Sequence, residues 1–228
     1  MSNRSLLYVD LLQKKNRFLV LLFALIVFFT LYPMVENIVI ARLILNLFFM
    51  LSVLSGIFAI ATTRRPMLVS STLALLAILF RWIHYFYNYE TAAILEHVAN
   101  VLFWIYIAIY ILKFILRQKI ITGELIYAAA AVYFIFGLAW ASIYQILELS
   151  HAHSFSLPDA TAGRQTFIFQ LWYFSMVTLT TLGYGDIAPV TMSARVFVVL
   201  EAILGQLYLA ILISGLIGKR IAQDKYPQ

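Results

Sequence analysis

The residues with the most specific chemistry are the nine at 178–186, which read Thr-Leu-Thr-Thr-Leu-Gly-Tyr-Gly-Asp. A cation that enters a narrow pore must exchange its water shell for other oxygen atoms, and backbone carbonyls can provide them. Carbonyls line one side of a strand only if the backbone dihedrals alternate in sense. Gly183 and Gly185 can adopt positive φ without a side-chain penalty, and the Thr181 hydroxyl could add another oxygen. The segment therefore predicts one strand of an ion-coordinating filter, so four chains must surround the ion path.

The apolar segment before the filter, residues 166–179, is shorter than the roughly 20 residues that a helix needs to cross a bilayer. It therefore predicts a re-entrant helix. The negative end of its dipole would point towards the ion path and favour a cation. Threonine-rich and glycine-rich stretches are often only loops, but this one lies between a half-length and a full-length apolar segment, and that context favours the filter.

The composition excludes an ordinary soluble domain. Hydrophobic residues make up 64% of the 228 residues and charged residues 11%, and the mean hydropathy is +0.93. A chain this short cannot hide so much apolar surface in its own interior, so we expect its solvent to be lipid. Cysteine is absent, which excludes disulfides and thiolate metal sites.

Six apolar runs predict membrane spans, and the fold class that we expect is an all-α membrane protein. The predicted spans are residues 18–32, 37–61, 67–87, 91–116, 121–147 and 191–217. Residues 1–17 predict a short amphipathic helix at the membrane interface. A basic start before an apolar run is also typical of a signal peptide, but no small-residue cleavage site follows the first run.

The net charge of +6 is distributed as a membrane topology requires, so we expect no nucleic-acid partner. Twelve of the sixteen basic residues fall in the leader, the loop at 62–66, the end of the fourth span with its linker, and the C-terminal end. If six spans alternate, these segments share one side. The opposite side holds the acidic residues Glu36, Glu90, Glu148, Asp159 and Asp186. The positive-inside rule then predicts a cell-membrane protein with both termini in the cytoplasm.

Residues 178–186 and their surroundings resemble the potassium-channel family, whose filter reads Thr-Val-Gly-Tyr-Gly and is commonly followed by Asp. The resemblance covers an outer helix, a polar turret, a pore helix, the filter and a glycine-bearing inner helix, roughly residues 120–220. The number and order of spans in the first 117 residues also resemble the six-span members. The resemblance implies a homotetramer in membrane lipid that conducts K⁺ passively, with K⁺ ions and no organic cofactor.

The resemblance divides the chain into four regions. They are a cytoplasmic interfacial helix at 1–17, a voltage-sensor-like four-helix domain at 18–117, a pore domain at 118–220 and a short cytoplasmic tail at 221–228. Voltage-gated relatives carry Arg or Lys at every third position of the fourth span, whereas here that span has only Lys113, at its inner end. Because steep gating requires several charges, each worth about 2.3 kcal/mol per 100 mV, we expect little or no intrinsic voltage sensing.

Carried over onto this sequence, the filter motif implies five ion-binding residues: Thr181, Leu182, Gly183, Tyr184 and Gly185. It also implies three supporting residues: Asp186, Tyr173 and Thr180. Two departures from the family pattern bear on gating at the filter rather than on selectivity. Leu182 replaces the usual Val, and the aromatic pair is Tyr173 and Phe174, of which only the tyrosine can reach Asp186.

The last span provides the predicted pore lining and gate: Gly205, Gln206, Leu209, Ile213 and Gly215. A glycine inside a helix costs about 1 kcal/mol relative to alanine, so Gly205 either lets the helix bend or lets it pack closely, and both interpretations are open. Glu201 lies one turn earlier. A carboxylate at that depth is costly unless it meets water or a donor, so we expect a structural or cavity-tuning role.

Polar residues inside the front half form a second candidate site: Arg42, Arg81, His84, Glu96, His97 and Asn100. Counted along their helices at about 1.5 Å per residue, they share one depth in the membrane. Charges at that depth usually face a partner or a water-filled crevice. We therefore expect Glu96 to pair with Arg81 or Arg42. The alternative is that each arginine extends separately towards the interface.

Three other functions have less support. A potassium-uptake transporter normally needs four pore loops per chain and this chain has one, while an intact filter argues against a non-conducting regulatory subunit. No catalytic constellation or nucleotide-binding loop is visible in the sequence, so we do not expect an enzyme.

His151 and His153, with Asp159 nearby, could hold a divalent metal. Two histidines are more often simply solvated, and the only metal that we expect is K⁺ at the filter.

Overall fold

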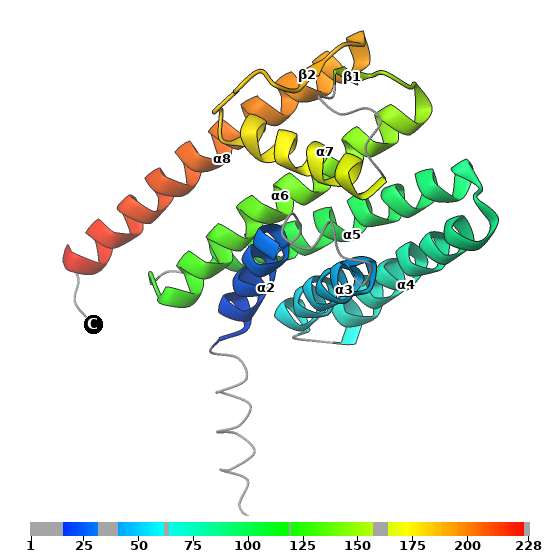
Figure 1. The fold of residues 1–228 in the computed structure, drawn as a ribbon. Helices are drawn as coiled ribbons and strands as arrows, with labels where there is room; N and C mark the ends of the chain where they lie inside the picture. Colours follow the sequence, from blue (N-terminus) through cyan, green and yellow to red (C-terminus); the bar gives the residue numbers. More distant parts are fainter. Residues whose placement is uncertain (1–15, 32–40, 62–63, 119, 157–163, 226–228) are drawn as a thin grey trace, which may run out of the picture.

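The computed structural model describes residues 16–31, 41–61, 64–118, 120–156 and 164–225, so the predicted interfacial helix falls almost wholly outside it. The elements, in chain order, are α2 (Arg17–Leu31), α3 (Ala41–Ile60), α4 (Arg64–Tyr87), α5 (Glu90–Arg117), α6 (Gly123–Ser150), β1 (Phe155–Ser156), α7 (Arg164–Leu179), β2 (Ala188–Pro189) and α8 (Met192–Lys225) (Figure 1). The fold is helical, as the sequence predicts, apart from the two short strands. They pair antiparallel, with Phe155 opposite Pro189, and so join the segment after α6 to the segment before α8.

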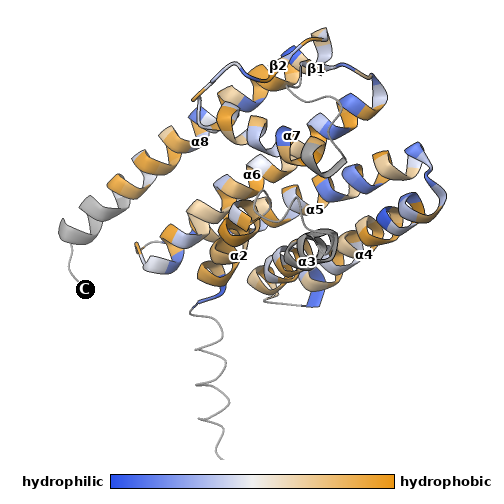
Figure 2. Cartoon of the chain, viewed as in Figure 1, coloured by the Kyte–Doolittle hydropathy of each residue, from blue (hydrophilic) through white to orange (hydrophobic). Residues whose placement is uncertain are grey.

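Four of the described helices are long and apolar enough to cross a membrane: α4, α5, α6 and Met192–Gly218 of α8. α2 and α7 are apolar but shorter, and so is Phe49–Ile60, the part of α3 whose side chains the structure describes. The first two of the six predicted spans therefore stay a prediction. α8 continues to Lys225, into the segment expected as a tail. Figure 2 shows that apolar residues predominate along the helices. Many of the large apolar side chains are exposed, for example Phe23, Leu75 and Ile211, which is the distribution that lipid requires.

Short-range contacts define where the helices begin and end. Asn88, in the turn between α4 and α5, has a φ of 52°, a conformation that asparagine adopts more readily than most residues. Nδ1 of His84 lies 2.9 Å from the carbonyl oxygen of Tyr89 and closes the same turn. α6 begins after a threonine cap, because the hydroxyl of Thr122 accepts a hydrogen bond from the amide of Leu125. These short connections place α5 between α4 and α6.

The main core lies between the front-half helices and α6 of the same chain. α2 contributes Phe18 and Phe28 to it, and α5 contributes Trp104 and Ile107. α6 presents a run of buried alanines that includes Ala128. Small residues let helix backbones approach closely, which favours helix association in lipid. The alanines therefore allow α2 and α5 to pack directly against α6.

The polar cluster of the front half is organised around an ion pair between α4 and α5. Nε of Arg81 donates to Oε1 of Glu96 over 2.9 Å, and the Glu96 side chain is 3% exposed. The Arg81 guanidinium also lies 4.6 Å from the centre of the Phe49 ring, a cation–π contact. Arg81 is therefore held by two neighbours instead of extending alone to the interface. The side chain of Arg42 lies outside the described residues, and His84 belongs to the α4–α5 turn.

The cluster extends into the second half of the chain. His97 and Asn100 are buried and line a small polar pocket together with Arg81. Gln145 of α6 and Trp172 of α7 line the same pocket. The structure thus connects the predicted polar cluster to α7, a connection that the sequence analysis did not anticipate.

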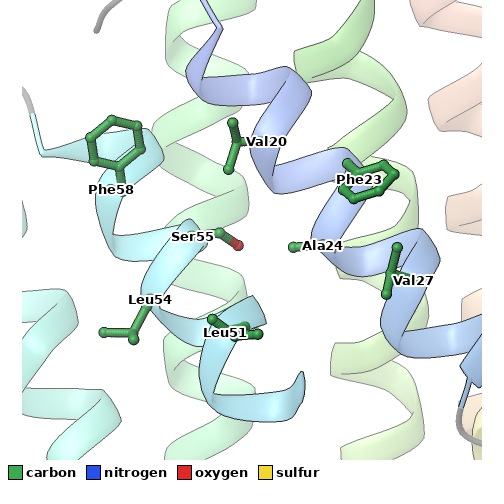
Figure 3. A pocket seen from close by; sticks show the side chains of 8 residues that line it. All are labelled: Val20, Phe23, Ala24, Val27, Leu51, Leu54, Ser55 and Phe58. Atoms are coloured by element: carbon green, nitrogen blue, oxygen red, sulfur yellow. The ribbon is translucent and has the colours of Figure 1, made fainter. Parts of the chain in front are cut away.

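An apolar groove of about 380 Å³ lies between α2 and α3. Figure 3 shows Ala24 of α2 and Ser55 of α3 facing each other across it. The Ser55 hydroxyl donates to the carbonyl of Ser52 over 2.8 Å, so its polar atom is already bonded within α3. The other residues that line the groove are apolar: Val20, Phe23, Ala24, Val27, Leu51, Leu54 and Phe58.

Replacing Glu96 by Gln should lower the thermal stability of the detergent-solubilised protein, because the Arg81 guanidinium would lose its charged partner. We expect a loss of roughly 2 kcal/mol, less than for a fully buried pair because the Arg81 side chain is 34% exposed. The matched control is Glu90→Gln, since Glu90 is exposed in the first turn of α5. Equal melting curves for the two variants would show that the pair does not stabilise the fold.

Candidate ion-conduction site

The backbone of residues 181–185 alternates in conformation. Thr181, Gly183 and Gly185 have φ values of 59°, 58° and 80°, whereas Leu182 and Tyr184 do not have positive φ. The two glycines therefore have the conformation that the sequence predicts. A Cβ at either glycine would meet nothing within 4 Å, so the backbone conformation, and not crowding, is what favours glycine there.

The segment is bonded to the last turn of α7. The amides of Leu182 and Gly183 donate to the carbonyl of Val177 over 2.9 and 3.4 Å, and the amide of Thr181 donates to that of Thr178 over 2.9 Å. The Thr180 hydroxyl donates to a carbonyl of the same helix, that of Met176, over 2.7 Å. The bonds from the amides satisfy the carbonyls of Val177 and Thr178 at the helix end and fix the segment relative to α7.

Aromatic residues of α7 hold the outer end of the segment. The hydroxyl of Tyr173 donates to Asp186, and this hydrogen bond raises the pKa of Tyr173 to about 12 because it stabilises the protonated phenol. Phe174 instead packs with Tyr144 and Phe155 in a smaller apolar cluster, separate from the main core. The division of roles within the aromatic pair is the one that the sequence predicts.

The end of α7 is a point of close packing with α6 and α8. The Tyr133 hydroxyl of α6 donates to the carbonyl oxygen of Leu179 over 2.8 Å. A Cβ at Gly205 of α8 would lie 2.7 Å from the same oxygen, closer than real Cβ contacts. Gly205 is therefore needed for close packing, which decides between the two interpretations of this residue. Gly215, one predicted gate residue, has nothing within 4 Å of its Cβ position.

Glu201 joins the same three helices one turn earlier on α8. Its side chain is fully buried, and it accepts hydrogen bonds from Tyr144 of α6 and, over 2.6 Å, from Ser175 of α7. The Ser175 hydroxyl also lies 2.9 Å from the carbonyl of Gly137. Glu201 thus has the structural role that the sequence suggested. The sequence did not identify Tyr144 and Ser175 as its partners, because a single hydroxyl residue in an apolar helix does not indicate which neighbouring helix it contacts.

The remaining predicted pore residues follow along α8. Nε2 of Gln206 donates to the hydroxyl of Thr181 over 3.1 Å. Leu209 is half-buried and Ile213 is exposed in the single chain. The predicted lining therefore starts in contact with the filter segment and continues along a helix whose end stands clear of the others (Figure 1).

The turret between α6 and α7 is organised by a carboxylate. Glu148 accepts hydrogen bonds from the amides of His153 and Phe155 over 2.8 and 3.0 Å. His151 and His153 are exposed, and Asp159 lies outside the described residues. Among the residues that the structure describes, no three potential metal ligands come together. The turret histidines thus form no metal site within the described part of the chain.

Comparison with known proteins places these elements in a family. The ion-channel family model matches residues 121–220. The chain is similar to Two-pore potassium channel 5 of Arabidopsis thaliana, with 47% identity over 45 residues, and to Two pore potassium channel c of Oryza sativa subsp. japonica, with 38% identity over 58 residues. Residues 121–220 therefore match the ion-channel family.

The similarity covers a part of each relative. The matches span 20% and 25% of this chain, but 11% and 13% of the two plant channels. Protein LctB of Geobacillus stearothermophilus is 35% identical over 79 residues, which are 34% of this chain and 58% of LctB. No solved structure matches the chain. The match to the ion-channel family therefore rests on residues 121–220, the part of the chain that contains α6, α7, residues 181–185 and most of α8.

Alanine at Gly205 should destabilise this ion-channel domain, because its Cβ would push α8 away from the Leu179 carbonyl. Overpacking of this kind costs about 1–3 kcal/mol, and the helix propensity of alanine offsets about 1 kcal/mol of it. Gly215→Ala is the matched control on the same helix, since its Cβ would meet open space. Thermal melting in detergent should therefore show a lower transition for Gly205→Ala and an unchanged or higher one for Gly215→Ala. The reverse order would contradict the packing role.

Proposed function

We propose that the chain assembles as a homotetramer and conducts K⁺ passively and selectively across the cell membrane. Residues 181–185 would form the selectivity filter, with one strand from each chain. The observation that carries the proposal is the alternation of positive φ at 181, 183 and 185 within the segment matched by the ion-channel family. Alternating dihedrals turn successive carbonyls to one side, and rings of carbonyls can replace the hydration shell of K⁺.

Two surfaces of the single chain support a closed assembly. The side chains of Leu182 and Tyr184 are 56% and 67% exposed. In an apolar 18-residue stretch of Met192–Gly218 in α8, only 11% is buried. Four chains around one axis would cover these surfaces and bring four strands of carbonyls together, which is the closed symmetry that most homo-oligomers adopt.

The proposed topology has six spans with both termini in the cytoplasm. Residues 18–117 would form a voltage-sensor-like bundle that acts as a scaffold, and residues 118–220 the pore domain. The distribution of basic residues supports this orientation. In this topology Asp186 would lie at the outer end of the filter, and Gln206, Leu209 and Ile213 would lie along the inner cavity.

Flux from liposomes tests the proposal. The reconstituted wild-type protein should pass K⁺ far faster than Na⁺. Gly185→Ala should abolish this selectivity, because a residue with a Cβ is strained at the φ of 80° found there. Gly123→Ala, at the start of α6, is the matched control and should keep it. Equal K⁺ and Na⁺ flux in the wild type, or normal selectivity in Gly185→Ala, would overturn the filter assignment.

Voltage should have little effect on the open probability. α5 carries Lys113 and Arg117 only near its end, and Arg81 of α4 is paired with Glu96, so the front half offers no ladder of mobile charges. Planar-bilayer recordings should therefore give a shallow conductance–voltage relation between strongly negative and positive potentials. A steep relation, equivalent to many elementary charges per tetramer, would contradict the scaffold role of residues 18–117.

A further inference from the structure

A side chain of α8 contacts the filter segment directly. Nε2 of Gln206 donates to Oγ1 of Thr181 over 3.1 Å. The same hydroxyl donates to the carbonyl of Thr180 over 2.7 Å. Thr181 is the innermost residue of the proposed filter, and its φ of 59° is unusual for a β-branched residue.

These two bonds fix the direction of the Thr181 hydroxyl. A hydroxyl has one proton to donate and two lone pairs with which to accept. The proton is directed to the Thr180 carbonyl, and the Gln206 amide occupies one lone pair. One lone pair is left for a cation. Because a cation is attracted by the lone pair and repelled by the proton, the direction of the hydroxyl decides how well it serves as a ligand.

The backbone that carries Gln206 is held close to the filter. Gly205, the preceding residue, packs against the Leu179 carbonyl at the end of α7. Glu201, one turn earlier, is bonded to Ser175 of α7. The Gln206 amide therefore reaches Thr181 from a part of α8 that is fixed relative to α7, not from a mobile helix end.

We infer that Gln206 is a positioning residue for the innermost cation site of the filter. It holds the Thr181 hydroxyl so that its remaining lone pair is available to an ion, and it thereby sets the affinity of that site for cations that enter from the cavity. In a tetramer, four such amides would act on four hydroxyls. The inference rests on the proposed function, because it requires residues 181–185 to form a filter.

Block by Ba²⁺ measures this affinity. Ba²⁺ has nearly the radius of K⁺ and twice its charge, so it should occupy an oxygen site that fits K⁺ and stop the current. Methionine matches glutamine in length but cannot donate a hydrogen bond. In Gln206→Met, block by Ba²⁺ from the inner side should require at least roughly tenfold more Ba²⁺ than in the wild type, because tenfold is the scale of one lost hydrogen bond and each tetramer would lose four. Gln206→Asn, whose amide is one methylene too short, should show a comparable loss and provides the test if Gln206→Met does not assemble.

A double-mutant cycle separates positioning from a general effect on the cavity. Thr181→Ala removes the hydroxyl through which Gln206 acts, so adding Gln206→Met to it should change Ba²⁺ block by less than about twofold. Thr181→Ser keeps a hydroxyl and should restore the dependence on Gln206. Gln145→Met is the matched control. It makes the same chemical change on α6, where the amide donates to the Ala141 carbonyl, and should leave the block unchanged.

The outcomes distinguish this inference from the proposed function. A K⁺-selective wild-type current with unchanged Ba²⁺ block in the Gln206 variants would overturn the inference alone. Additive losses in the double variant would do the same. A wild-type tetramer without K⁺-selective current would overturn both.

Discussion

The proposed filter, residues 181–185, depends on a backbone that is strained at Thr181 and that reaches positive φ without a side-chain penalty only at Gly183 and Gly185. A non-glycine residue in the left-handed region costs of order 1–3 kcal/mol and persists only where its surroundings fix it. Here the amides of Leu182 and Gly183 bond to the carbonyl of Val177. These amides thus satisfy a carbonyl at the end of α7, and the same bonds orient the proposed filter. Gly205 of α8 packs against the carbonyl of Leu179, at the end of α7. The pairing of β1 with β2 ties down the chain on its outer side.

The front half packs against the same rigid unit. The ring of Phe28 in α2 lies 4.6 Å from that of Trp172 in α7. The polar pocket around Arg81 includes Trp172 as well as Gln145 of α6. In lipid, helices associate through close packing and polar contacts instead of a hydrophobic driving force. The front half therefore contacts α7 at Trp172, both through Phe28 of α2 and through the pocket around Arg81.

The sequence predicted features that depend on local chemistry and missed those that depend on distant contacts. The short helix at 166–179 and the positive φ of Gly183 and Gly185 could be predicted, because both depend only on the types of a few neighbouring residues. The partner of Glu96 could be narrowed to two arginines by depth alone, and the structure pairs it with Arg81. By contrast, the bonds from Tyr144 and Ser175 to Glu201 join three helices whose relative rotation no periodicity specifies. Gly205 illustrates the same limit, since only its distance from Leu179 decides between bending and packing.

The most direct test of the account is to locate permeant ions in the assembled protein. Rb⁺ resembles K⁺ closely and can be identified by anomalous X-ray scattering from crystals grown in its salt. The account predicts Rb⁺ on a fourfold axis, ringed by the carbonyl oxygens of residues 181–185 from four chains and by the Thr181 hydroxyls at the inner end. An assembly with another number of chains around the axis, or a fourfold axis without Rb⁺ between residues 181 and 185, would contradict it.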